Sequence, residues 1–376
     1  MSTTRAGGAD ILESFSGLAS AFAKKELTAA REAHDRFPFA PFWSDVLEKA
    51  IGVGFFGITL PAGYGGLGLD ADALVPVVRM LARADASLSA LVCTHAAALQ
   101  VIAESAGDTG ADPAYRMIGK SPGKPLAFQS FTHPDELEMP VAVSDGDAYR
   151  LTGSVRFLAA GAVADFAVVA GSGGRSGEFS YYLIALNTGA VSVSEPIFTL
   201  GLHACPVVDA RLDDALGILL GKKGGGIEYC RRAWPRLSLA SAAIPLGILE
   251  GSLDEAKRYA EERVQGGRVI IEWPEVRMIL ARIAGDVHVA HGALAEACRM
   301  FAANEPGWEA ASVAAALSAG EAAARGTVDG VQVLGGNGYM TDYGQEKRMR
   351  DAKQAQFLLG MPALRRLELM GLPAQR

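Results

Sequence analysis

Four long helix-forming runs follow a glycine-rich segment in the second half of the chain, and they constrain the fold more than any other feature. After Lys222–Gly226 (KKGGG), apolar residues recur at three- and four-residue spacing almost to the end of the sequence. The predicted helices are Ile227–Gln265, Pro274–Asn304, Glu309–Leu334 and Gly344–Met370. Helices of this length, joined by short loops, are typical of a four-helix bundle.

The residues before the bundle divide into a helical part and a strand-rich part. Apolar periodicity predicts helices over Ile11–Phe22, Phe42–Gly54 and Asp72–Ser105. Short β-branched and aromatic runs, separated by glycine and asparagine turns, then predict strands over Ala148–Phe157, Asp165–Gly171, Phe179–Leu186, Val191–Ser194 and Val207–Leu212. We therefore expect an α+β chain with an N-terminal helical domain (residues 1–123), a middle antiparallel β domain (124–220) and a C-terminal helical bundle (221–376).

Composition excludes several classes of protein. With 376 residues, 50% of them hydrophobic and 20% charged, the chain can bury a sizeable core. A net charge of -7 opposes nucleic-acid binding. No uninterrupted apolar run reaches the roughly 18 residues that span a bilayer, and the first residues lack the apolar core of a signal peptide. Four separated cysteines, and histidines without metal-ligand spacing, predict free thiols, no metal site and a cytoplasmic protein.

The segment Val331–Leu359 carries the most specific motif of the chain. It contains a Gly-Gly-Asn-Gly turn after a helical run, followed by Glu346–Lys353 (EKRMRDAK). These residues resemble the C-terminal signature of the acyl-CoA dehydrogenase family, which reads QxxGGxGY, then ERxxRDAK, then YEGT. Three earlier segments, Gly57–Gly66, Gly146–Gly153 and Leu200–Cys205, are similar to further motifs of that family in the same order. The resemblance covers nearly the whole chain and implies the family fold.

The resemblance also implies a reaction and a cofactor. Members of the family oxidise an acyl-CoA thioester between its α and β carbons, with FAD bound between subunits. By resemblance, the flavin contacts within one chain are expected at Thr132, Phe157 and Ala159. The adenine and phosphates of a neighbour's FAD are expected at Arg263, Gln332, Gly335 and Gly336. These residue types suit the task, because arginine presents planar donors to phosphate and glycine lets the backbone approach a pyrophosphate closely.

The usual catalytic base of the family is replaced in this chain. The glutamate of YEGT corresponds to Leu359, and the alternative glutamate of other members, on the first bundle helix, corresponds to Leu237. Leucine cannot accept a proton from the α carbon. Family contacts to the cofactor are also replaced at Ala159, Gly266, Met361 and Ala363. We interpret the bundle carboxylates Glu228, Glu250 and Glu368 as helix-face charges or ion pairs rather than relocated bases.

Three interpretations stay open at this point. The first is a base-lacking subunit of a heteromeric acyl-CoA dehydrogenase, which completes the cofactor site of a base-bearing partner and holds FAD sub-stoichiometrically when alone. The second is a homomeric enzyme of the family with a relocated base or flavin oxygenase-type chemistry. The third is a non-catalytic acyl-CoA-binding or scaffold protein.

We expect an oligomer with the bundle at its centre. The small residues of Ala311–Ala324 suit close helix contacts. Electron-transferring flavoprotein is the electron acceptor that the resemblance implies. The sequence does not specify the acyl chain.

Overall fold

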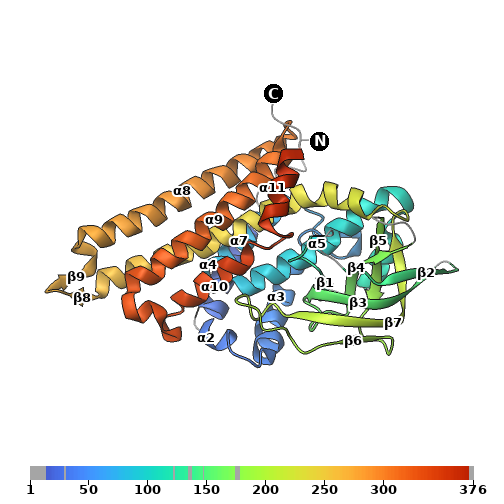
Figure 1. The fold of residues 1–376 in the computed structure, drawn as a ribbon, viewed down its shortest axis with the longest axis horizontal. Helices are drawn as coiled ribbons and strands as arrows, with labels where there is room; N and C mark the ends of the chain where they lie inside the picture. The colour runs from blue at the N-terminus through green and yellow to red at the C-terminus, as the bar shows by residue number, and fades with distance from the viewer. Residues whose placement is uncertain are drawn as a thin grey trace.

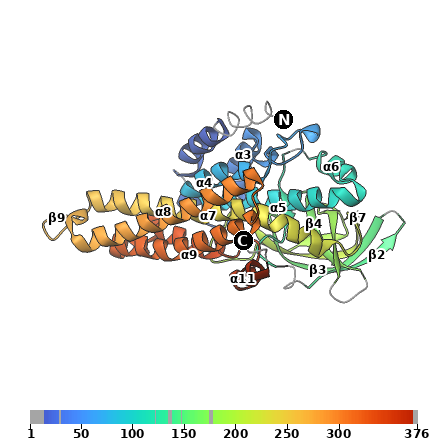
Figure 2. The same cartoon turned by 90° about the horizontal axis from the view of Figure 1, so that it is seen from above.

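The computed structural model describes residues 14–28, 31–121, 123–133, 138–146, 148–173 and 178–371. It consists of N-terminal helices, a seven-stranded sheet and a long helical bundle (Figure 1). Viewed from above, the N-terminal helices cover one side of both the bundle and the sheet (Figure 2). Residues 14–22 are helical, whereas the predicted start of that helix at Ile11 lies outside the described residues, as do Pro134 and Asp147.

The two main N-terminal helices, α4 (Leu74–Ala84) and α5 (Ala86–Thr109), come from one predicted run. The prediction of a single helix over Asp72–Ser105 was wrong because Asp85 has an extended backbone, and its carboxylate accepts the N–H of Ser87 as the N-cap of α5. The smaller elements are η1 (Ala23–Leu27), α2 (Arg31–His34), η2 (Phe42–Leu47), α3 (Glu48–Val53), η3 (Phe55–Gly57), η4 (Ala62–Tyr64), η5 (Ala71–Ala73) and α6 (Asp112–Ile118).

The sheet has the order β1-β3-β2-β4-β5-β7-β6 and closes on itself through further pairing of β1 with β4 and of β3 with β7. Most pairs are antiparallel, as predicted, but β4 runs parallel to both β1 and β2. Long connections, unlike tight hairpins, do not force neighbouring strands to be antiparallel. The strands are β1 (Leu126–Phe128), β2 (Val141–Asp145), β3 (Ala148–Ala159), β4 (Phe166–Ser172), β5 (Phe179–Ala185), β6 (Val191–Val193) and β7 (Val207–Leu220).

The bundle is built from α7 (Gly226–Glu262), α8 (Pro274–Ala303), α9 (Trp308–Leu334), α10 (Gln345–Ala355) and α11 (Pro362–Gly371). The prediction of one helix over Gly344–Met370 was wrong. Leu359 (φ 66°) and Gly360 (φ 107°) have left-handed backbones that cannot continue a right-handed helix. The shorter elements around the bundle are β8 (Val264–Gln265), β9 (Arg268–Val269), η7 (Ile270–Glu272), η8 (Gly335–Tyr339) and η9 (Thr341–Tyr343).

The small residues of α9 make their close contacts inside the chain. Ala315, Ala319 and Ala323 are buried, and α9 packs along both α7 and α8. Further along the helix, a side chain at Gly326 would overlap Leu249 of α7. The buried small residues therefore serve the bundle of a single chain.

Two helices, α5 and α7, are long and apolar enough by composition to cross a membrane. In each, 89% of the apolar window is buried inside the protein, as in the core helix of a globular domain.

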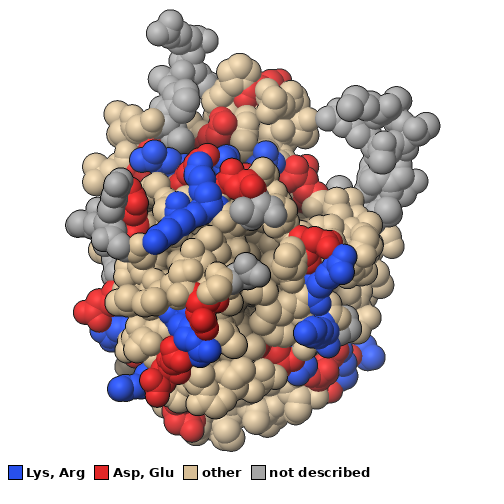
Figure 3. Space-filling view, turned by 90° about the vertical axis from the view of Figure 1, so that its right-hand side faces the viewer, with Lys and Arg blue, Asp and Glu red and all other residues tan. Residues whose placement is uncertain are grey.

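Charged side chains of both signs are mixed on the face of the molecule near the sheet domain (Figure 3). On the face drawn in Figure 3, the described Lys and Arg side chains are interspersed with Asp and Glu side chains, which agrees with the net charge of -7.

Candidate functional site

An apolar cavity of about 340 Å³ lies between the sheet and the end of α10. Phe131, Thr132 and Phe157 line it from the sheet side, and Gln354 and Phe357 line it from the bundle side. Its volume is within the range of about 300–1,000 Å³ that is common for small-molecule sites. Two of the three predicted flavin positions within the chain, Thr132 and Phe157, are therefore brought together here. The third, Ala159, is fully buried in β3.

An irregularity in β3 positions Phe157 at this cavity. The register of β3 against β7 shifts between Val155 and Leu158, and Phe157 adopts a φ of 56°. Its backbone N–H donates to Asp209 Oδ1 at 3.0 Å, and the Arg156 guanidinium lies 4.9 Å from its ring centroid. A left-handed residue other than glycine costs about 1–2 kcal/mol and is common at functional sites. The bulge places the Phe157 side chain in the wall of the cavity.

The two family base positions lie in closed core. Leu359 and Leu237 are 0% and 1% exposed and belong to one apolar cluster with Trp234. The Leu359 backbone N–H donates to the Ser130 carbonyl at 2.7 Å, which fixes the link between α10 and α11 against the sheet domain. Neither position offers a proton acceptor, and the apolar side chains fill the space that a carboxylate would need.

A second cavity, of about 560 Å³, is bounded by Trp234, which packs in the same apolar cluster as these leucines. It is lined by Ile227, Arg231 and Trp234 of α7 and by the pair His133 and Glu368, whose Nε2 and Oε1 atoms are 2.8 Å apart. His133 is 5% exposed, follows Thr132 directly and packs against Gly360. This pair therefore lies next to the segment that should carry the base. Sequence reasoning interpreted Glu368 as a helix charge and did not single out His133, which stands where the related motif LTEP has glutamate.

The other predicted cofactor positions lie at the end of the bundle away from the sheet (Figure 1). Arg263, Gln332, Gly335 and Gly336 are exposed there, and the Arg263 guanidinium has no hydrogen bond or ion pair with any residue in the described ranges. Asn337 Nδ2 donates to the Tyr259 hydroxyl at 2.9 Å, which holds the loop after α9 against the end of α7.

This end of the bundle can receive an anionic group from outside the chain. A Cβ at Gly335 or Gly336 would meet nothing within 4 Å, so the backbone is open to a ligand. Arg263 supplies a cation at the same end. These residues fit the phosphates of a cofactor, whereas the aromatic cavity against the sheet fits its ring.

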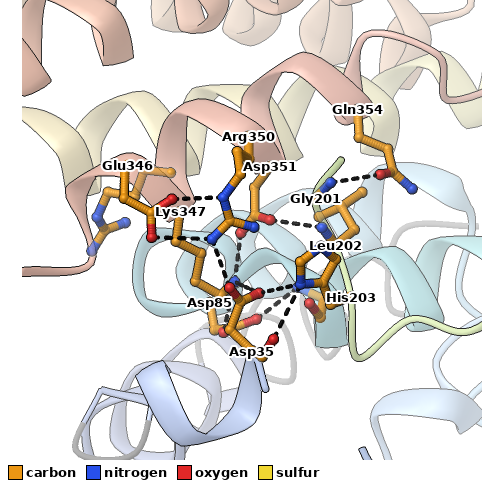
Figure 4. A network of polar contacts seen from close by, with 12 residues as sticks. Asp35, Asp85, Gly201, Leu202, His203, Glu346, Lys347, Arg350, Asp351 and Gln354 are labelled. Atoms are coloured by element: carbon orange, nitrogen blue, oxygen red, sulfur yellow. Dashed lines mark hydrogen bonds and ion pairs between the residues drawn. The ribbon is translucent and has the colours of Figure 1, made fainter. Parts of the chain in front are cut away.

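A buried network of ion pairs holds α10 in place (Figure 4). Lys347 Nζ lies 3.0 Å from Asp85 Oδ2 and 2.6 Å from Asp351 Oδ2, and Arg350 pairs with Asp35 at 2.6 Å. Burial works to lower the pKa of Lys347, but Asp351, Asp85 and Asp35 outweigh burial and raise it. Asp351 Oδ1 also accepts the N–H of Leu202 at 2.7 Å. The network joins α10 to the N-terminal helices and to the loop before β7.

His203 belongs to this network and stands where the related motif LGxRxS has arginine. Its Nδ1 lies 3.0 Å from Asp35 Oδ1, and its Nε2 lies 2.9 Å from the Thr199 carbonyl oxygen. Both ring nitrogens face acceptors, so the protonated form is favoured, and the hydrogen bond to Asp35 raises the pKa of His203. Although burial opposes it, the pKa of Asp35 falls to about 2, chiefly through His203 and Lys347. Because Thr199 lines the apolar cavity, the network also positions a wall of that cavity.

Comparison with known proteins agrees with this architecture. The model of the acyl-CoA dehydrogenase N-terminal domain matches residues 11–109, and the model of the C-terminal domain matches residues 224–369. This chain belongs to the acyl-CoA dehydrogenase family. Members of the family are FAD-dependent oxidoreductases that act on CH–CH bonds.

Individual relatives extend the match over nearly the whole length. An acyl-CoA dehydrogenase of Bacillus subtilis (strain 168) is 29% identical over 358 residues, which are 92% of this chain and 93% of the relative. The butyryl-CoA dehydrogenase of Megasphaera elsdenii superposes with a TM-score of 0.85 at 22% identity, covering 96% of this chain and 97% of that one. The FAD complex of PigA superposes with a TM-score of 0.83 at 18% identity, covering 96% of both chains. The predicted fold class is confirmed.

Proposed function

We propose that this chain is a base-lacking subunit of an acyl-CoA dehydrogenase, which binds an acyl-CoA thioester and completes the FAD site of a base-bearing partner. One contrast supports the proposal. Both family base positions, Leu359 and Leu237, are buried in apolar core, while the residues expected to face a neighbour's cofactor stay exposed at the far end of the bundle.

Two separate groups of residues in this chain suit the two parts of FAD, its flavin ring and its phosphates. FAD, when bound, takes up the hydride that leaves the β carbon of the acyl chain. Phe157 and Thr132 line the cavity that would receive the ring, and the Thr132 hydroxyl donates to the Gln129 carbonyl at 3.1 Å. Arg263 would pair with a phosphate, and the backbone of Gly335 and Gly336 lets the pyrophosphate approach. We expect these two groups to serve different FAD molecules in an oligomer.

The same geometry explains why we expect the isolated chain to be inactive. Removing the α proton of a thioester needs an acceptor within hydrogen-bonding reach, and such a group commonly contributes about 10²–10⁴ in rate. Leu359 and Leu237 supply none. The second cavity still offers apolar side chains, Ile227 and Trp234, to an acyl group.

The visible spectrum of the purified chain tests the proposal, alone and co-expressed with a base-bearing family chain encoded beside it. We expect flavin well below one per subunit in the isolated chain, and full flavin with turnover in the co-expressed sample. In the co-expressed sample, Arg263→Met should lower the flavin content, while Arg282→Met, at an exposed arginine paired with Asp329, should not. Tightly held flavin and ordinary turnover in the chain alone would sink the proposal. Flavin in neither sample would favour a non-catalytic acyl-CoA-binding protein.

The His133–Glu368 pair supports a second candidate function, a homomeric dehydrogenase with a relocated base. The pair lines the 560 Å³ cavity next to Gly360, and a carboxylate is the group that the family uses to accept the α proton. In this case the isolated chain turns over an acyl-CoA with an artificial electron acceptor.

This candidate makes a distinct prediction. Glu368→Gln should then lower kcat by about 10²–10⁴. The matched control is Glu321→Gln, at a carboxylate that pairs with Arg366 and does not line the cavity. Equal turnover in the two variants would exclude Glu368 as the base.

A further inference from the structure

A polar pocket of about 410 Å³ lies apart from both cavities, where residues 14–28, α4, α7 and the start of α10 meet. Charged side chains dominate its wall. The cations are Lys24, Arg31, Arg83, Arg258 and Arg348, and the anions are Asp254 and Glu255. The pocket therefore has three excess positive charges, although the whole chain has a net charge of -7.

The two carboxylates of this pocket are already paired. Asp254 lies 2.6 Å from Arg83, and Glu255 pairs with Arg258 and lies 3.5 Å from Arg31. Arg348 has no carboxylate within ion-pair distance among the described residues. Arg348 is thus a buried cation of the pocket that lacks a paired carboxylate.

Arg348 is 6% exposed, and its one hydrogen bond within the described part of the chain runs from Nη1 to the Arg83 carbonyl oxygen at 2.8 Å. Its Nε is buried without a partner, and so is the Nε of Arg31. Burial, followed by the charge of Arg31, lowers the pKa of Arg348 to about 9, so the side chain is still a cation at neutral pH. A buried cation without a counter-ion is costly, and a bound anion would remove that cost.

Two glycines lie against the guanidinium groups of Arg348 and Arg31. A Cβ at Gly251 would overlap Arg348 Nη1 and the Arg83 carbonyl oxygen. A Cβ at Gly344, which has a φ of 63°, would overlap the guanidinium of Arg31. Two glycines on different elements therefore leave the space in which the two guanidinium groups lie.

We propose that this pocket binds a phosphate-type oxyanion, either free or as the monoester of a small metabolite. Guanidinium groups match the oxygens of phosphate through paired N–H donors. A phosphate group near neutral pH carries between one and two negative charges, which suits the excess of three cations better than a single carboxylate does. The volume of the pocket leaves room beside the phosphoryl group for a small organic part.

The site is independent of the proposed role in acyl-CoA oxidation. Arg348 occupies an unspecified position of the motif ERxxRDAK, so the resemblance to the family does not account for a buried arginine there. Lys347, the preceding residue, points instead into the paired network with Asp85 and Asp351.

Calorimetric titration of the full-length chain with inorganic phosphate, at constant ionic strength in chloride, tests the proposal. We expect saturable binding by the wild-type protein. Arg348→Met should weaken it about tenfold or more, because a hydrogen bond to a charged group is lost. Without phosphate, Arg348→Met should unfold at the same temperature as the wild type or a higher one, because an unpaired buried charge is removed. Arg282→Met, at an exposed arginine of α8, should bind phosphate like the wild type.

A parallel titration with glycerol 3-phosphate distinguishes the two sources of the anion. Tighter binding of the ester than of inorganic phosphate would identify an organic phosphate, and the reverse would identify the free ion. If Arg348→Met does not fold, Arg31→Met gives the same comparison, because Arg31 lines the same pocket. Binding of neither compound to the wild type, or equal binding to the wild type and the folded variant, would overturn the proposal.

Discussion

The buried side chains in α10 and those just beyond its end differ in charge. At its start, Lys347 and Asp351 are fully buried and paired with each other and with residues of the N-terminal helices. Just beyond its end, Leu359 stands in apolar core where the family motif has the glutamate that does the chemistry. The buried charges join the domains, whereas the position that the resemblance aligns with the reacting glutamate is apolar.

Losing one member of a buried ion pair and losing an isolated glutamate have different effects on stability. Removing one member of a buried ion pair leaves an uncompensated charge and costs about 3–5 kcal/mol. Replacing an isolated glutamate by leucine leaves no partner unpaired, and burying a leucine side chain contributes about 1.5–3 kcal/mol. Stability therefore preserves the network around Lys347 even without catalysis, whereas it favours leucine at position 359.

The largest effect is expected at Lys347. Lys347→Met removes the cation between Asp85 and Asp351 and should lower the free energy of unfolding by about 3–5 kcal/mol. Urea denaturation measures the change. The matched control is Lys257→Met, at an exposed lysine paired with Glu261, which should cost about 0–1 kcal/mol. Equal losses in the two variants would contradict the idea that the buried network joins the domains.

A smaller effect is expected at the other end of α10. Leu359→Glu restores the family residue but places a carboxyl group among apolar side chains, which should cost about 1–3 kcal/mol while the carboxyl group is protonated. Desolvation raises the pKa of such a group, so stability relative to the uncharged control Leu359→Gln should fall as pH rises above about 4.3. Thermal unfolding of both variants between pH 5 and pH 8, values chosen for the test, checks this. A pH-independent difference would show that water or a cation reaches this position.

The smallest effect concerns His203, where a titratable cation replaces the arginine of the family motif. Asp35 raises the pKa of His203, so the stabilisation by the charged imidazole is fully present below its unfolded pKa of about 6.5. It is lost as pH rises through the folded value. Compared with His203→Gln, the wild type should lose an advantage of about 1 kcal/mol on going from acidic to alkaline pH. His203→Arg should show no such loss, and a flat wild-type profile would contradict the prediction.

Much of the fold could be predicted because periodicity and turn residues are local signals. The three-part order and most strands follow from them, but the breaks in two helices do not. The run around Asp85 looks like one helix, and it breaks where the buried carboxylate both caps α5 and meets Lys347, which is 262 residues away in the sequence. The break at Leu359 follows from a backbone bond to Ser130 of the sheet domain.

The candidate site also contains some residues that motifs predict and others that only the fold brings together. Thr132, Phe157 and the exposed glycines after α9 could be predicted as cofactor positions from motifs, because those motifs have fixed residue types in a fixed order. The His133–Glu368 pair joins residues 235 positions apart, and the motif that contains His133 gives no sign of the contact with Glu368. Arg348 looks like one more charge on an exposed helix until the structure shows that it is buried.

The sequence by itself determined the family and the order of helical and strand-rich parts, because each depends on residue type at a position. The tertiary structure alone decided that Leu359 is packed in apolar core and which charges are paired. Burial and pairing depend on side chains that approach from distant segments. For this reason Lys347 and Arg348, adjacent in the chain and alike in charge, end in different environments. Lys347 pairs directly with two carboxylates, whereas Arg348 has none within ion-pair distance among the described residues.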